Sequence, residues 1–231
     1  MKIRVFLILS VLSFTSSAFA QKMQDDMASS LKVIPQEVQL LKMADNLVAY
    51  GRQTNSALPL IQAVQIYRSL NVVDAADDAI QTSPFSEAQI LSDATKFADG
   101  NKTLLALVKE AGKSTRAGVF EEPLRYFRVV ESGETISQPL HVDGSHYIQV
   151  LVDGQGEGVF SQDKDGNKVY SDLRLNVYDN KGRVIASDQS GGKNCVAAFI
   201  SRTNNMTIAI KNVGKLSDNC IIYVQKTRMN Y

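Results

Sequence analysis

Hydrophobic and polar residues alternate in short runs along the C-terminal half of the chain. Within residues 173–179, leucine or valine occupies positions 173, 175 and 177, and a polar turn containing Gly182 leads into a second, largely apolar run at 183–186. A period of two places the apolar side chains on one face of a strand. The pattern therefore predicts a β-hairpin that buries one face.

The same pattern recurs through the rest of this half. Gly, Asp and Asn turns separate eight strand candidates, at residues 125–131, 136–142, 147–153, 173–179, 183–186, 195–200, 206–212 and 220–225. Many short strands joined by such turns are typical of an antiparallel β-sandwich or jelly roll. We expect that fold for residues 118–231.

The N-terminal half shows the period of helices instead. After Pro35, apolar residues recur at helical spacing as far as Tyr50, and Gly51 is expected to end the helix. A second helix is expected at residues 58–70. Because the connection between the two is short, they predict an antiparallel hairpin.

Two more helices are expected before the period changes. Ser86 and Gln89 have the spacing of a capping box, which predicts a helix from Glu87 onward, and an apolar pattern at residues 101–111 predicts another, ended by Gly112. The chain is therefore expected to be α+β with two domains. Residues 21–117 would form a small helical bundle that precedes the sandwich.

The first twenty residues have the three parts of a secretory signal peptide. Lys2 and Arg4 precede an apolar run at residues 5–14, and small residues then lead to Ala20. Cleavage after Ala20 would make Gln21 the first mature residue. The apolar run is shorter than the roughly 20 residues that cross a bilayer, which argues against a membrane anchor.

The charge balance argues against a nucleic-acid partner. The 231 residues include 25 basic and 24 acidic side chains, and removing the signal peptide leaves 23 basic ones. A nucleic-acid-binding surface needs an excess of basic residues, which this chain lacks. No later segment is apolar enough to span a membrane, so the mature protein is expected in the periplasm or outside the cell, without a membrane span.

Cys195 and Cys220 are the only cysteines. An even count in an exported protein favours a disulfide, because the compartment beyond the inner membrane is oxidising. The bridge would close a loop of about 25 residues, worth roughly 3 kcal/mol in the chain-entropy model. Two separately buried thiols are the alternative. A redox pair is disfavoured, since catalytic cysteines are usually closely spaced near a helix N-terminus.

Oxygen donors are concentrated in two Gly-containing loops and at the ends of the neighbouring strands. They are Asp153, Glu157, Asp163, Asp165, Asn167, Asp172 and Asp179. Carboxylate and amide oxygens on short loops are the ligands that calcium prefers, so these residues are a candidate calcium site. Asp-Gly sequences are equally what tight turns require for positive φ angles, and turn residues are the alternative. No other cofactor is expected.

No residue is assigned a catalytic role. The only histidines, His141 and His146, flank Asp143 in a turn, and a zinc site would need a further ligand. The sequence contains neither H-E-x-x-H nor G-x-S-x-G, so an enzyme is not expected. Tyr126 and Phe127 near the domain junction indicate either packing between the two halves or a patch for a partner.

Two runs carry a family resemblance. One is D-L-R-L-N-V-Y-D at residues 172–179, followed by Gly182, the A-S-D at 186–188 and Cys195; the other is T-I-A-I-K-N-V-G at residues 207–214. Together they resemble the bacterial pre-peptidase C-terminal domain and its collagen-binding-domain-like relatives, over about residues 119–226. Arg174 stands where the family often has a second acidic residue, which puts a metal contact there in doubt.

The resemblance implies a β-sandwich or jelly roll on a secreted bacterial protein, where such domains aid secretion or substrate binding beside a peptidase. No peptidase motif is present here. We therefore expect a non-enzymatic envelope protein with a binding or accessory role, whose partner is an unidentified protein or glycan of the cell envelope. A module that binds calcium, a small ligand or a glycan is the alternative.

Overall fold

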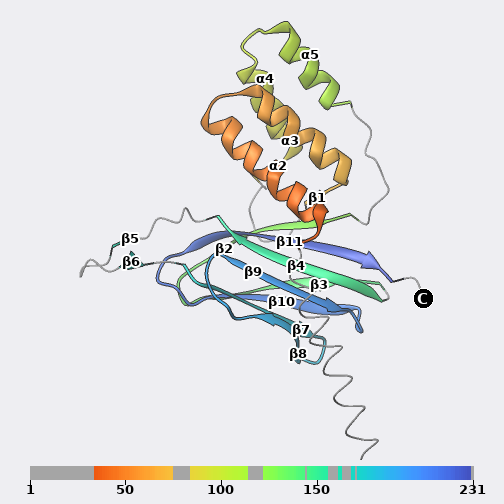
Figure 1. Cartoon of the computed structure of the whole chain (residues 1–231), viewed down its shortest axis with the longest axis vertical. Coiled ribbons are helices and arrows are strands. Elements are labelled where there is room, and N and C mark those ends of the chain that lie inside the picture. The colour runs from red at the N-terminus through yellow and green to blue at the C-terminus, as the bar shows by residue number, and fades with distance from the viewer. Residues whose placement is uncertain are drawn as a thin grey trace, which may run out of the picture. The chain divides into compact units, whose positions relative to one another are not determined.

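The computed structural model describes residues 34–74, 84–113, 122–143, 145–155, 161–162, 168–169 and 171–229. All of them belong to one compact unit, Ile34–Tyr231, in which the helices and one two-residue strand precede the other strands (Figure 1). The predicted signal peptide, with its cleavage site between Ala20 and Gln21, lies outside the described residues. The predicted boundary at residues 117 and 118 lies outside them as well.

The described helices are α2 (Gln36–Gln53), α3 (Ala57–Leu70), α4 (Glu87–Phe97) and α5 (Lys102–Ala111). The first two pack together as the expected hairpin. However, α2 continues past Gly51, so the prediction that this glycine ends the helix was wrong. Gly51 instead allows close packing, because a Cβ there would lie 2.7 Å from Cδ2 of Leu60 on α3.

Helix α4 begins at Glu87 as predicted, but the capping box is not formed. The side chain of Ser86 makes no cap hydrogen bond, and Gln89 Nε2 donates instead to Asp93 Oδ1 at 3.1 Å. In α5 the cap is Asn101, whose side-chain oxygen accepts from two backbone N–H groups of the first turn. Such caps satisfy donors that have no partner inside the helix.

Two facing sheets form the β-sandwich (Figure 1). The first has the order β1-β2-β11-β4-β9 and the second β3-β10-β7-β8; β5 and β6 pair only with each other. The strands are β1 (Val73–Asp74), β2 (Leu124–Val130), β3 (Thr135–His141), β4 (His146–Gly154), β5 (Ser161–Gln162), β6 (Lys168–Val169), β7 (Leu173–Asp179), β8 (Val184–Asp188), β9 (Asn194–Ile200), β10 (Asn205–Asn212) and β11 (Asp218–Arg228). All neighbours are antiparallel except β1 and β2.

This arrangement confirms the α+β fold class and each of the eight predicted strands. The three strands that the sequence did not indicate, β1, β5 and β6, have two residues each. A segment of two residues is too short to show an alternation of apolar and polar positions. Only its pairing with another strand identifies it as a strand.

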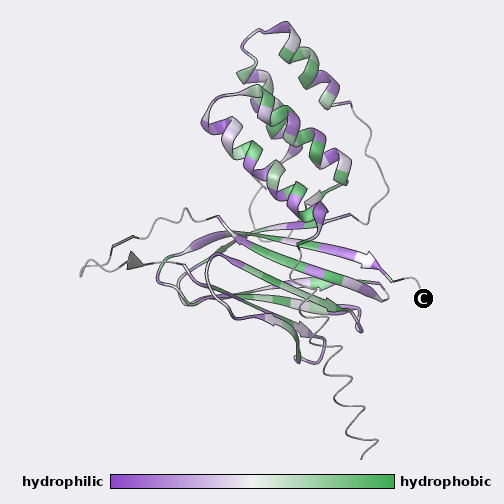
Figure 2. Cartoon of the chain, viewed as in Figure 1, coloured by the Kyte–Doolittle hydropathy of each residue, from purple (hydrophilic) through white to green (hydrophobic). Residues whose placement is uncertain are grey.

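The sandwich core lies between the two sheets, and alternate residues of each strand enter it. Hydropathy changes from residue to residue along the strands (Figure 2). The inward faces expected for β7 and β10 are confirmed: their core residues are Leu173, Leu175, Val177, Met206, Ile208 and Ile210. Within this pair, Ile208 lies opposite Val177 and Ile210 opposite Leu175.

A second core lies on the outer face of the first sheet, where the helices pack. Leu151 of β4 and Ile221 and Tyr223 of β11 join the buried residues of the helices. Both faces of these strands are therefore covered. This explains why residues 220–224 are apolar without interruption, since a strand that is buried on two faces needs no polar side.

A buried polar cluster connects α2 to this sheet. Asp45 of α2 forms an ion pair with Arg125 of β2, and both side chains are 3% exposed. The hydroxyl groups of Tyr67 and Tyr223 donate to the two oxygens of Asp45, each at 2.5 Å. The Arg125 guanidinium also lies 4.7 Å from the centre of the Tyr67 ring. Burial, and then the Asp45 charge, raise the pKa of both tyrosines.

Candidate functional site

Cys195 and Cys220 are free thiols, and the predicted disulfide was wrong. Cys195 on β9 lies opposite Val152, and Cys220 on β11 lies opposite Gly154. Strand β4 therefore runs between the two cysteines. The Cα atoms of the two cysteines are therefore at least two strand spacings apart, which is about 9.5 Å. A disulfide tolerates a Cα separation of at most about 7 Å. The alternative of two separately buried thiols is what the structure has.

We expect neither thiol to react in the native protein. Both are fully buried, and burial is the main cause that raises the pKa of each to about 12. A thiol reagent at pH 8 should modify neither cysteine until denaturant is added, and then both, because the thiolate is the reactive species. Mass spectrometry of labelled native and denatured protein measures this. A denatured chain that labels only after reduction would mean that the cysteines are bridged.

Two described members of the proposed calcium set lie far apart. Asp172 and Asp179 flank opposite ends of β7, about 23 Å apart along the strand. Asp179 holds its own turn together, accepting from the backbone N–H groups of Lys181 and Arg183 at 2.9 Å. These bonds, with that from Arg183 foremost, lower the pKa of Asp179.

The other described candidate, Asp153, is 5% exposed and pairs with Lys42 of α2 at 2.8 Å. Among the described residues, no group of three or more His, Cys, Asp or Glu is placed to hold a metal ion. The remaining candidates lie outside the described residues: Glu157, Asp163, Asp165 and Asn167. Calcium binding there stays a prediction.

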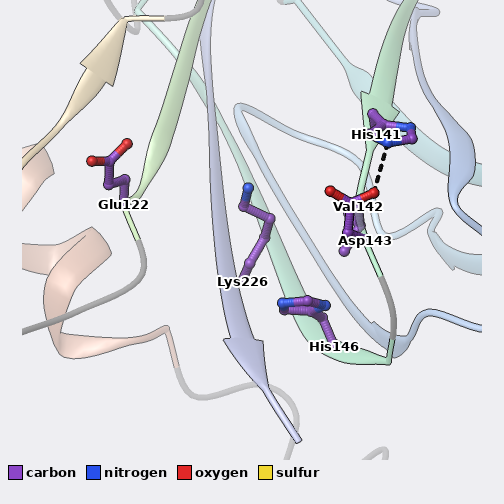
Figure 3. A pocket seen from close by; sticks show the side chains of 6 residues that line it. All are labelled: Glu122, His141, Val142, Asp143, His146 and Lys226. Carbon is purple, nitrogen blue, oxygen red and sulfur yellow. Dashed lines mark hydrogen bonds and ion pairs between the residues drawn. The ribbon is translucent and has the colours of Figure 1, made fainter.

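A cleft of about 370 Å³ lies at one end of the sandwich (Figure 3). Its residues come from the end of β3, the start of β4, the last part of β11 and the segment before β2. They are Glu122, His141, Val142, Asp143, His146 and Lys226. Five of these six side chains are titratable, so the lining of the cleft combines acidic, basic and imidazole groups.

The polar cleft arises because the inward positions of the first sheet change from apolar to polar at this end. Val224 of β11 faces the sandwich core, and Lys226 occupies the next position of the same face. On β4, Ile148 faces the core, and His146 lies two residues before it on the same face of the strand. Glu122 occupies the corresponding position ahead of β2. The alternation that buries the core therefore directs these charged groups into the cleft.

His141 is held in place by hydrogen bonds from both ring nitrogens. Nδ1 lies 2.7 Å from Asn205 Oδ1, and Nε2 lies 3.0 Å from Asp143 Oδ1. The bond to Asn205 and then that to Asp143 raise the pKa of His141, while the charge of Lys226 opposes them. A protonated imidazole can donate to both oxygens at once, which is why they favour the charged form.

Lys226 is partly buried and takes part in no ion pair within the described part of the chain. Its side chain extends between Glu122 on one side and the His141–Asp143 pair on the other (Figure 3). Glu122 accepts a hydrogen bond from the side chain of Asn71, at the end of α3. Among the described residues, the ammonium group of Lys226 therefore has no ion-pair partner.

Sequence reasoning found the histidines and Asp143 but missed the other two charged groups. Strand β11 was expected to end at Gln225, so Lys226 was not recognised as an inward position. The period of two along residues 220–226 was the available signal. Of the junction residues, Phe127 packs against the helix-side core, which confirms the predicted packing between the two halves for this residue. Tyr126 instead enters the core between the two sheets.

Comparison with known proteins identifies no family. No family model matches the sequence, and no curated protein matches it. The structure is similar to the Yersinia pseudotuberculosis-derived mitogen, with a TM-score of 0.33 and 9% identity over 48% of this chain and 89% of that one. The pre-peptidase C-terminal domain of a Bacillus anthracis collagenase gives a TM-score of 0.26 and 12% identity over 47% and 80%.

A carbohydrate-binding module of Cellvibrio mixtus lichenase 5A, solved with cellotriose, gives a TM-score of 0.25 and 15% identity over 43% of this chain and 75% of that one. At these scores the likenesses do not bear on function. Within the described residues, no helix has the length and apolar character needed to cross a membrane.

Proposed function

We propose that this chain is a non-enzymatic binding protein of the cell envelope, in which the end of a pre-peptidase-C-terminal-like sandwich holds a polar ligand. The observation that carries the proposal is the cleft at the ends of β3, β4 and β11, where the apolar core gives way to five titratable side chains. Export through the signal peptide at residues 1–20 is part of the proposal. So is membership of the family that the runs on β7 and β10 resemble.

The packing of the helices supports ligand binding at the end of the sandwich that β3, β4 and β11 form. Helices cover the outer face of the first sheet through Leu151, Ile221 and Tyr223. That face is therefore closed to a ligand, whereas the five titratable side chains that line the cleft are exposed or partly buried. The helical part serves to stabilise the sandwich and leaves its end accessible.

The chemistry of the lining favours a ligand rich in hydroxyl groups, such as an envelope glycan. Lys226 only donates hydrogen bonds, and Glu122 and Asp143 only accept them as carboxylates. Each sugar hydroxyl both donates and accepts, so a mixed lining satisfies it in several orientations. Such convergent polar groups on a preformed scaffold are typical of small-ligand sites.

Titration of the full chain with a panel of envelope saccharides tests the proposal. Calorimetry should detect binding to the wild type, and Lys226→Met should weaken that binding. The matched control is Lys211→Met, an exposed lysine on the outer face of β10, which should bind like the wild type. Equal binding by wild type and both variants would place the ligand elsewhere, and no binding to any saccharide would remove the proposal.

A further inference from the structure

Opposite charges line the cleft without pairing with one another. Lys226 forms no ion pair among the described residues, although the carboxylates of Glu122 and Asp143 line the same cleft. Among the described residues, Glu122 accepts from the neutral side chain of Asn71, and Asp143 lies 3.0 Å from Nε2 of His141. The cleft therefore presents an ammonium group and two carboxylates that do not neutralise that ammonium group.

His141 positions Asp143 and has no ring nitrogen left for a ligand. Its Nδ1 lies 2.7 Å from Asn205 Oδ1, and its Nε2 lies 3.0 Å from Asp143 Oδ1. The two oxygens of a carboxylate offer about four acceptor sites, so Asp143 and Glu122 can each accept further hydrogen bonds. The cleft thus keeps acceptors for a cationic group of a ligand and, in Lys226, a donor for an anionic group.

This lining disfavours a ligand with a single charge. A carboxylate bound by Lys226 is also repelled by Glu122 and Asp143, and an ammonium group bound by Glu122 is also repelled by Lys226. A ligand that carries both groups can place each one next to its opposite. Its attractions then act over shorter distances than its repulsions, so the net electrostatic energy is favourable.

We propose that the cleft binds a zwitterionic ligand, whose carboxylate contacts Lys226 and whose ammonium group contacts Glu122. Asp143 adds a second negative charge on the far side of Lys226 (Figure 3). The inference rests on the proposed function for the hydroxyl-rich part of the ligand. It narrows the ligand class to a saccharide that carries both an amino group and a carboxyl group.

The test measures the binding of a matched set of probes to the full chain at pH 7 by calorimetry. Muramic acid carries an amino group and a carboxyl group, N-acetylmuramic acid only the carboxyl group, glucosamine only the amino group, and glucose neither. Muramic acid should bind at least about tenfold more tightly than the other three, because it alone makes both charge-assisted contacts. A zwitterion without hydroxyl groups, γ-aminobutyrate, probes the charged contacts alone.

Two variants that each remove one charge separate the two contacts. Lys226→Met should weaken the binding of muramic acid about tenfold and that of glucosamine by less, because the contact to the carboxylate is lost. Glu122→Gln keeps an oxygen that can accept from Asn71. It should weaken the binding of muramic acid about tenfold but not that of N-acetylmuramic acid, whose carboxylate it no longer repels. The matched controls, Lys211→Met and Glu110→Gln, change exposed residues of β10 and α5 and should bind like the wild type.

The outcomes separate this inference from the proposed function. If muramic acid binds no more tightly than glucose, glucosamine or N-acetylmuramic acid, the zwitterion site is overturned while saccharide binding stands. If γ-aminobutyrate binds through Lys226 and Glu122 but no saccharide binds, the zwitterion site stands and the saccharide proposal is removed. Binding of muramic acid that is unchanged in Lys226→Met or in Glu122→Gln overturns the zwitterion site. If no probe binds, both proposals are overturned.

Discussion

Replacing Arg125 with alanine is expected to lower the free energy of unfolding by about 3–5 kcal/mol, because it leaves a buried charge without its partner. Asp45 would keep the hydroxyl groups of Tyr67 and Tyr223 as donors but would lose the cation that balances its charge. The guanidinium also contacts the rings of Tyr67 and Phe85, so packing is lost as well. Denaturant unfolding followed by circular dichroism measures the change.

Arg183→Ala is the matched control for Arg125→Ala. Arg183 also pairs with an aspartate, Asp179, but its own side chain is 71% exposed. The Asp179 side chain is itself only 3% exposed, but in this variant it would keep the backbone N–H groups of residues 181 and 183 as donors. An ion pair with a solvent-exposed arginine contributes between about 0 and 1 kcal/mol, so this variant should unfold close to the wild type. Equal losses in the two variants would mean that the buried pair does not fasten α2 to the sheet. Arg125→Lys should recover only part of the stability, since lysine lacks the planar fork.

The buried pair shows both what the sequence could reveal and where it stops. Val38, Leu41 and Val48 form the apolar stripe that predicted α2, and Asp45 falls on the same stripe. A charged residue at such a position indicates a buried partner. Its identity could not be read, because Arg125 lies 80 residues further along the chain and no period links a helix to a strand of another layer.

Local patterns succeeded wherever one face of a strand was buried and the other was not. That rule located β7 and β10 and their core residues, since a one-residue slip would expose all of them. Strand order is a different kind of information, and the cysteines illustrate it. The even number of cysteines and the oxidising compartment of an exported protein favoured a disulfide. However, β4 lies between β9 and β11 and separates Cys195 from Cys220.

For the same reason, the sequence indicated only some of the residues that line the cleft. His141, Asp143 and His146 are neighbours in sequence, and their proximity followed from the turn that they occupy. Glu122 and Lys226 reach them through the pairing of β2, β11 and β4. In a single strand, a polar residue at an inward position near the strand's end indicates a polar site. Only the assembled sheets show which side chains meet at that site.

Raising the pH from 8.5 to 10.5 is expected to lower the free energy of unfolding by about 5 kcal/mol, because two thiols must stay protonated in the folded chain. Burial raises the pKa of Cys195 and Cys220 to about 12, well above the value of about 8.5 in an unfolded chain. The free energy of unfolding that the two protonated thiols contribute is fully present below pH 8.5 and is lost as the pH rises toward 12. Each thiol accounts for about 1.4 kcal/mol per pH unit.

Denaturant unfolding with a phosphine reductant present, at intervals from pH 7.5 to 10.5, measures this slope without oxidation of the unfolded chain. The matched control is the double variant Cys195→Ala, Cys220→Ala. It should be less stable at pH 7.5, because it leaves space in the sandwich core, yet it should keep its remaining stability as far as about pH 10. Above that pH, Tyr67 and Tyr223 add their own loss in both proteins, since their pKa values are raised by burial. A wild-type protein whose stability does not change up to pH 10.5 would contradict the presence of two buried, free thiols in the core.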